Sequence, residues 1–184
     1  MNLPNKLTIL RIILVPIMVI IPFFNIQGEV CGLPITYLLI DLIFIIAAIT
    51  DKLDGYIARS RNQITTFGKF LDPIADKLLV SSALISFVGL NRLQAWIVII
   101  LIAREFIISG FRLVASDSGI VLAASWWGKF KTAFQMIMCI LLIINIQNNV
   151  FTVINNVFIY ISLALSVISL ADYLIKNRKV ISDM

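Results

Sequence analysis

The chain has 184 residues, of which 60% are hydrophobic and only 14% charged, and its mean hydropathy is +1.02. A soluble domain carries about 25% charged residues, so this composition excludes an ordinary soluble protein and indicates an integral membrane protein. The chain has no histidine, which excludes imidazole bases, and its net charge of +5 comes with no basic tail of the kind that binds nucleic acid. Any bound metal must be held by oxygen, as magnesium and manganese prefer.

Six apolar segments follow one another along the chain, at about residues 8–25, 34–50, 71–90, 93–115, 132–147 and 150–175. With its flanks, each can supply the roughly 20 residues that a membrane-spanning helix needs. The first segment resembles a signal peptide, but no small-residue cleavage site follows it, so a retained helix is the simpler interpretation. The sequence predicts an all-α membrane protein with six transmembrane helices, forming one domain over residues 1–184.

The basic residues predict how these helices are oriented, because cytoplasmic loops carry an excess of lysine and arginine. Nearly all of them lie at the N-terminus, in the links after the second and fourth segments and in the C-terminal tail, whereas the opposite side has only Arg92. We therefore expect a multi-pass protein of the cell (cytoplasmic) membrane, with both termini and the two long links on the cytoplasmic side.

Four aspartates flank the link after the second segment. If the second helix continues past its apolar part, Asp51 and Asp54 share one face of it, and Asp72 and Asp76 are one turn apart where the third segment begins. Four carboxylates in one space raise each other's pKa unless cations neutralise them. A pair of divalent cations would do so, and such pairs can clamp a phosphoryl group. The alternative is that each aspartate is an ordinary solvated charge.

Small side chains lie on the same helical face. Gly55 and Ala58 would let a phosphate or nucleotide approach the helix backbone, and Arg59 offers a fork of donors for phosphate oxygens. The whole stretch "DKLDGYIARSRNQITTFGKFLDPIADK" resembles the signature of the CDP-alcohol phosphotransferases, D-x2-D-G-x2-A-R-x8-G-x3-D-x3-D, and fills each of its fixed positions.

This resemblance implies a fold and a reaction. Members of the family have six transmembrane helices, are usually homodimers, and use two divalent metal ions, magnesium or manganese, while an alcohol attacks a CDP-linked lipid and CMP leaves. The segment "PNKLTILR" also resembles the start of the family and would close over the nucleotide. The implied metal ligands are Asp51, Asp54, Asp72 and Asp76, with Asp76 also the base for the alcohol. The implied nucleotide-site residues are Asn5, Thr8, Asp51, Gly55, Ala58 and Arg59.

A second group of charges bears on which alcohol is used. Arg104 lies near the middle of the fourth segment, with Arg112 two turns further on the same face, and Lys129 and Lys131 precede the fifth segment. A cationic pocket favours an acceptor that carries phosphate, so we expect glycerol 3-phosphate rather than choline, ethanolamine or serine. The stretches "REFIISGFR" and "GKFKTAFQ" resemble those of phosphatidylglycerophosphate synthases within the family.

Several alternatives stay open. Inositol phosphate is also an anionic acceptor, so a phosphatidylinositol-phosphate synthase or another CDP-alcohol phosphotransferase fits the same pattern. Arg104 can instead pair with Glu105, Asp41 or Asp117, and Lys129 and Lys131 can simply anchor a helix at the cytoplasmic surface. A different class, a divalent-cation transporter, would use the aspartates as an ion site, and a lipid-binding scaffold would need no metal.

Overall fold

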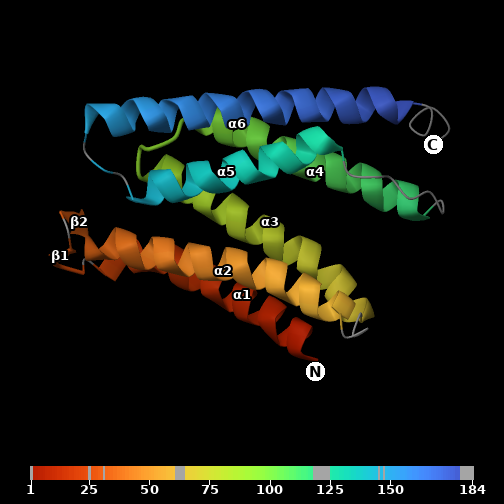
Figure 1. The fold of residues 1–184 in the computed structure, drawn as a ribbon, viewed down its shortest axis with the longest axis horizontal. Helices are drawn as coiled ribbons and strands as arrows, with labels where there is room; N and C mark the ends of the chain where they lie inside the picture. The colour runs from red at the N-terminus through yellow and green to blue at the C-terminus, as the bar shows by residue number, and fades with distance from the viewer. Residues whose placement is uncertain are drawn as a thin grey trace. The chain divides into compact units, whose positions relative to one another are not determined.

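The computed structural model describes residues 2–24, 26–30, 32–60, 65–117, 125–144, 146 and 148–178. Inside these ranges, the side chains left outside the description are those of Lys52, Ala58, Arg59, Thr66, Phe67, Lys69, Phe70 and Asp117. The described residues form six α-helices, as the sequence predicts (Figure 1). The helices are α1 (Leu3–Ile20), α2 (Ile35–Ser60), α3 (Thr66–Gly89), α4 (Ala95–Asp117), α5 (Trp126–Ile144) and α6 (Asn149–Lys176).

Three stretches among the described residues are long and apolar enough to cross a membrane. They are Leu3–Phe24, which comprises α1 and the 3-10 helix η1 (Ile21–Phe24), and the helices α5 and α6. The other three helices, α2, α3 and α4, carry the acidic residues of the two clusters described below. The protein therefore has the helices of a membrane protein, and six spans remain a prediction.

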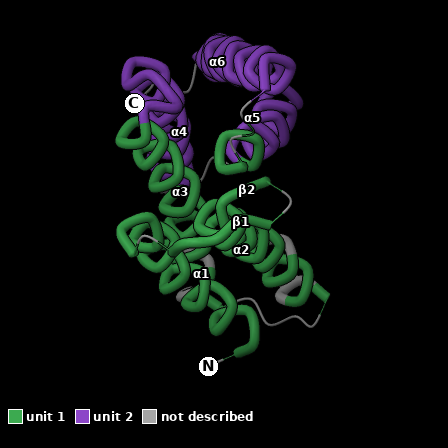
Figure 2. The backbone as a smooth tube through the Cα atoms, turned by 90° about the vertical axis from the view of Figure 1, so that its left-hand side faces the viewer, with its two compact units in different colours: residues 1–90, 140–146 green, residues 91–139, 147–184 purple. Residues whose placement is uncertain are grey.

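The chain divides into two compact units (Figure 2). Unit 1 comprises residues 1–90 and 140–146, and in it α1 lies against both α2 and α3. A short antiparallel hairpin of β1 (Glu29–Val30) and β2 (Leu33–Pro34), which the sequence did not predict, joins η1 to α2. Alanines such as Ala47 and Ala75 are fully buried on α2 and α3. Small residues at such positions allow helix backbones in a membrane protein to approach closely.

One face of α1 changes character along its length. Its buried residues recur every three or four positions, as one helical face requires. The first part of that face is polar, with Asn5, Thr8 and Arg11, and the second is apolar, with Val15 and Met18. The sequence of α1 therefore buries a polar stripe inside unit 1, and this stripe positions the candidate site.

Unit 2 comprises residues 91–139 and 147–184, of which α4, α5 as far as Cys139 and α6 are described. In this unit α4 lies against α6, and the rings of Phe134 on α5 and Phe158 on α6 are 5.8 Å apart. Asn148 caps the start of α6: its Oδ1 accepts a 3.0 Å hydrogen bond from the backbone N–H of Val150. Its buried face includes three serines, Ser162, Ser166 and Ser169, so unit 2 also has a polar interior.

Candidate functional site

The signature residues lie on two helices of unit 1. The α2 helix runs without interruption to Ser60, which confirms that residues 51–59 continue the helix of the second apolar segment. Asp51, Asp54 and Gly55 are therefore neighbours on α2, and Asp72 lies in the second turn of α3. Asp76 follows one turn later on α3 and is half-buried.

Arg11 of α1 connects the two aspartates of α2. Its Nη1 donates to Asp51 Oδ1 over 2.8 Å, and its Nη2 donates to Asp54 Oδ2 over 2.6 Å. The Arg11 side chain is 0% exposed and that of Asp54 is 2% exposed, whereas Asp51 is 37% exposed. Because hydrogen bonds between ionised groups are roughly twice as strong as neutral ones, this fork fixes both carboxylates relative to α1.

Thr8 extends the same link to α3. Its Oγ1 donates to Asp72 Oδ1 over 2.6 Å and lies 3.5 Å from Asp54 Oδ2. The side chain is buried, one turn before Arg11 on the polar face of α1. Three signature carboxylates from two helices therefore converge on two neighbouring side chains of α1.

The start of α3 is tied to α1 as well. Thr65 caps this helix: its Oγ1 accepts a 3.0 Å hydrogen bond from the Gly68 N–H and donates over 2.9 Å to Asn5 Oδ1. A Cβ atom on Gly68 would lie 3.1 Å from Asn5 Oδ1 and 3.7 Å from Asp72 Oδ2. The glycine of the signature is therefore needed because this junction has almost no room for a side chain.

Burial and neighbouring charges affect Asp54, which lies beyond the apolar part of α2 at residues 34–50. Burial raises its pKa to about 6, the Arg11 guanidinium opposes this rise, and the nearby Asp51 and Asp72 carboxylates add to it. Carboxylates held this close together are stabilised by cations. Arg11 supplies one positive charge to a group that carries several negative ones.

The donor set suits hard divalent cations. Each of Asp51, Asp54 and Asp72 turns one oxygen toward Arg11 or Thr8, and carboxylate oxygen is what magnesium and manganese prefer. Among the described residues, no three acidic side chains lie close enough together to hold a metal ion without some movement. Gly55 is half-buried on α2, and the side chains of the other two predicted nucleotide-site residues, Ala58 and Arg59, lie outside the described residues.

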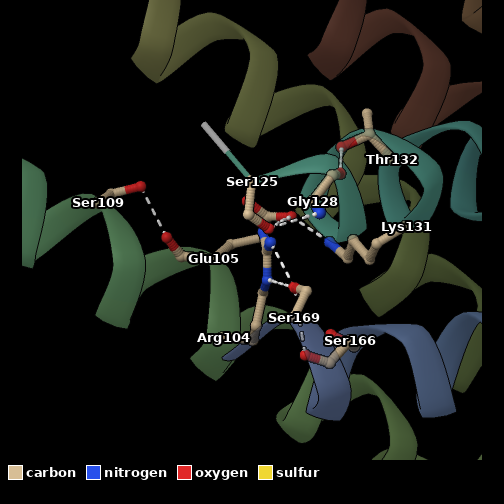
Figure 3. Close-up of polar contacts among 9 residues, drawn as sticks. All are labelled: Arg104, Glu105, Ser109, Ser125, Gly128, Lys131, Thr132, Ser166 and Ser169. Carbon is tan, nitrogen blue, oxygen red and sulfur yellow. Dashed lines mark hydrogen bonds and ion pairs between the residues drawn. The ribbon is translucent and has the colours of Figure 1, made fainter. Parts of the chain in front are cut away.

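The predicted acceptor-site residues lie in unit 2, and two of them meet at one carboxylate (Figure 3). Arg104 Nη1 lies 3.3 Å from Glu105 Oε1, and Lys131 Nζ forms an ion pair with the same oxygen. Arg104 also donates to Ser169 Oγ on α6, over 2.9 Å from Nε and 2.6 Å from Nη2. Arg104 is 8% exposed and Lys131 is 1% exposed. The pairing of Arg104 with Glu105, which the sequence left open, is present.

The other two basic residues of this group are exposed, and each lies over an aromatic ring. The guanidinium carbon of Arg112 is 5.8 Å from the centroid of the Tyr173 ring, and Lys129 Nζ is 4.4 Å from that of Trp126. Such cation–π contacts are weak at exposed sites, so these two side chains keep the freedom to meet an anion.

Comparison with known proteins agrees with the signature. The sequence profile described as CDP-alcohol phosphatidyltransferase matches residues 1–168. The chain belongs to this family. A CDP-diacylglycerol--glycerol-3-phosphate 3-phosphatidyltransferase of Bacillus subtilis is 51% identical over 141 residues, which are 74% of this chain and 73% of that protein. The enzyme of the same name from Haemophilus influenzae is 44% identical over 141 residues, 74% and 72% of the two chains. A probable phosphatidylglycerophosphate synthase of Mycobacterium tuberculosis is 38% identical over 136 residues, 74% and 63% of the two chains.

Membership in the CDP-alcohol phosphatidyltransferase family confirms the resemblance seen in the signature. Sequence reasoning missed two polar residues around the two clusters, Thr65 and Ser169. Thr65 had a signal, since threonine is favoured as a helix cap and stands three residues before Gly68. No sequence signal marked Ser169 beyond its being a serine in an apolar helix, because its contact with Arg104 joins residues 65 positions apart. Glu105 was named only as a possible partner of Arg104.

Proposed function

We propose that this protein transfers a phosphatidyl group from CDP-diacylglycerol to sn-glycerol 3-phosphate, giving phosphatidylglycerophosphate and CMP. The observation that carries this proposal is the convergence of Asp51, Asp54 and Asp72 on Thr8 and Arg11. This convergence supports the signature residues as one functional site, because side chains far apart in the sequence meet there. The choice of substrates follows the names of the Bacillus subtilis and Haemophilus influenzae relatives.

Two divalent cations, magnesium or manganese, would be held by the four signature aspartates, Asp51, Asp54, Asp72 and Asp76. When bound, they would neutralise the charge of the diphosphate that links CMP to the lipid. Arg11 and Thr8 orient three of these carboxylates from α1, which presents their oxygens from fixed positions. The nucleotide would lie against Asn5, Gly55, Ala58 and Arg59, where small side chains leave room for it.

Asp76 acts as the general base in this proposal. It takes the proton of the glycerol 3-phosphate hydroxyl while that oxygen forms a bond to the phosphorus next to the diacylglycerol. The bond between this phosphorus and the oxygen of the CMP phosphate breaks, and CMP leaves with the electron pair. Arg104, Arg112, Lys129 and Lys131 bind the phosphate of the acceptor, which is why an anionic alcohol is favoured over choline or ethanolamine.

The setting of the reaction is part of the proposal. Six transmembrane helices in one domain, with both termini in the cytoplasm, would give a homodimer in the cell membrane whose site faces the cytoplasmic leaflet. There the enzyme would take one substrate from the bilayer and the other from the cytosol. The three apolar helical stretches and the distribution of lysine and arginine support this arrangement.

The test is release of CMP by purified protein in detergent, with CDP-diacylglycerol and magnesium. Glycerol 3-phosphate, inositol 1-phosphate, serine and no acceptor are compared. We expect release with glycerol 3-phosphate alone, and a decrease of about 10²–10⁴-fold in kcat for Asp76→Asn, the range for loss of a general base. Glu29→Gln removes an exposed carboxylate in the β1–β2 hairpin and should leave the rate unchanged.

Two results would contradict the proposal. Release with another acceptor would retain the family reaction and overturn the interpretation of the basic residues. Absence of metal-dependent release with every acceptor, in protein shown to be folded, would overturn the reaction itself and favour cation transport.

A further inference from the structure

Glu105 is the negative centre of the basic cluster in unit 2. Its Oε1 accepts from both Arg104 and Lys131, and the two cations come from different helices, α4 and α5 (Figure 3). Buried like charges repel one another strongly unless a counter-ion lies between them. One carboxylate shared by two buried cations holds them together and leaves the group with a net positive charge.

The orientation of Arg104 is fixed from three helices. Besides Glu105 on its own helix, Arg104 contacts Ser169 on α6, whose hydroxyl accepts from both Nε and Nη2. On α5, a Cβ atom at Gly128 would lie 3.2 Å from Arg104 Nη2, so the glycine leaves just enough space for the guanidinium. The guanidinium plane is therefore set by its surroundings, unlike that of the exposed Arg112.

Polar atoms next to this cluster indicate that it receives a polar ligand. Gln135 lies one turn beyond Lys131 on α5 and is 2% exposed, and neither its Nε2 nor its Oε1 has a hydrogen-bond partner among the residues that the structure describes. The same holds, within the described part of the chain, for Ser166 Oγ, one turn before Ser169 on α6. Unpaired buried polar atoms are costly and rare. In an ion-pair network with a purely structural role, we would expect these polar atoms to be hydrogen-bonded to other protein groups.

We propose that Glu105 is a positioning residue for the acceptor: it holds Arg104 and Lys131 in the arrangement that binds the phosphate of an anionic alcohol. This inference rests on the proposed function, since it concerns the same acceptor. A net positive charge in a buried setting attracts a phosphate ester and disfavours a cationic alcohol. Glu105 does not contact the reacting atoms; it acts through the two cations.

Steady-state kinetics of CMP release tests this inference, with both substrates varied. For Glu105→Gln we expect the KM for glycerol 3-phosphate to rise about tenfold or more, because the two buried cations then repel one another and lose the arrangement that binds the phosphate. The KM for CDP-diacylglycerol should stay unchanged. Glu105→Asp keeps the charge on a shorter side chain and should recover part of the loss.

A second variant changes the position of the Arg104 guanidinium without changing any charge. Gly128→Ala keeps every charged group but brings a Cβ atom against Arg104 Nη2, so it should raise the KM for glycerol 3-phosphate several-fold. The matched control is Asp172→Asn, which changes an acid to its amide in another ion pair of unit 2, with Lys176 at 2.7 Å. It should leave both KM values unchanged. If Glu105→Gln does not fold, Gly128→Ala carries the test.

Direct binding gives a readout that is independent of turnover. Glycerol 3-phosphate should raise the melting temperature of the wild type in detergent, and should do so only at higher concentration for Glu105→Gln and Gly128→Ala. An unchanged KM for glycerol 3-phosphate in both variants, with an active wild type, would overturn this inference and leave the proposed function intact. A fall in kcat alone would assign Glu105 a purely structural role. A wild type that releases no CMP with glycerol 3-phosphate would overturn both.

Discussion

The two polar clusters of this protein are built with opposite signs. In unit 1 one buried cation, Arg11, holds two carboxylates, Asp51 and Asp54. In unit 2 one carboxylate, Glu105, holds two buried cations, Arg104 and Lys131. In each case a single residue of opposite charge allows like charges to lie together inside a helical unit. The acid-rich cluster is suited to take up cations and the base-rich cluster an anion, which is the division of labour that the proposed reaction needs.

The clusters differ in how completely their central residue is enclosed. Arg11 is 0% exposed and its partner Asp54 is 2% exposed, whereas the Glu105 side chain is 26% exposed. Removing the central charge of unit 1 therefore leaves a carboxylate with little access to water. Removing one cation of unit 2 leaves Glu105 with Arg104 still beside it. The comparison predicts that unit 1 depends more strongly on its single counter-ion.

The largest effect that we predict on stability is that of Arg11→Leu. It should lower the free energy of unfolding in detergent by about 3–5 kcal/mol, the cost of breaking a buried ion pair by removing one partner. Lys131→Leu removes one of the two cations of unit 2 and should cost less, since Glu105 keeps Arg104 beside it. Thermal or denaturant unfolding of both variants, followed by circular dichroism, measures the difference. Equal losses of unfolding free energy, or a larger loss for Lys131→Leu, would contradict the predicted difference between the two units.

The two clusters also differ in how far the sequence could predict them. The aspartates of α2 and α3 were found because their spacing of three and four residues fixes their relation within a helix. The contacts of Asp51 and Asp54 with Arg11 were not predictable, because they join residues 40 and 43 positions apart and depend on how α1 packs. In unit 2 the contact of Lys131 with Glu105 joins residues 26 positions apart, and no fixed spacing marks it.

Most of the fold could be predicted from the apolar segments of the sequence. All six helices among the described residues were predicted, but α5 begins at Trp126, six residues before the predicted 132. The reason is that Lys129 and Lys131 were assigned to the link, whereas the helix includes them because their charges meet Trp126 and Glu105. The β1–β2 hairpin was missed because its strands have two residues each and carry no periodic pattern.

The second prediction concerns the glycine beside each cluster. Gly68→Ala should destabilise the protein by about 1–3 kcal/mol, because overpacking a tight contact forces neighbouring groups to shift. Its Cβ would lie 3.1 Å from Asn5 Oδ1 and 3.2 Å from Thr65 Oγ1, two atoms that are joined by a hydrogen bond. Gly128→Ala should destabilise less, because the atom it meets is the far end of a longer side chain, that of Arg104.

Gly110→Ala is the control for both glycine substitutions. Apart from the neighbouring backbone of α4, no atom of the described residues lies within 4 Å of its added Cβ, so the change should be neutral or stabilise α4 by up to about 1 kcal/mol through helix propensity. Melting temperatures of the three variants give the ranking. A Gly68→Ala protein as stable as Gly110→Ala would show that the junction of α1 and α3 has more room than these distances allow.

The smallest predicted effect belongs to an ion pair whose cation is exposed to solvent. Lys176 Nζ lies 2.7 Å from Asp172 Oδ1, one turn earlier on α6, and the Lys176 side chain is 64% exposed. Lys176→Ala should cost about 0.3–0.5 kcal/mol, because water screens such pairs and the long side chain loses entropy on pairing. The loss should shrink further at high salt, whereas that of Arg11→Leu should not. If Lys176→Ala cost as much as Arg11→Leu, charge pairing alone would account for both. Burial would then no longer explain why Arg11 and Glu105 are central to their units.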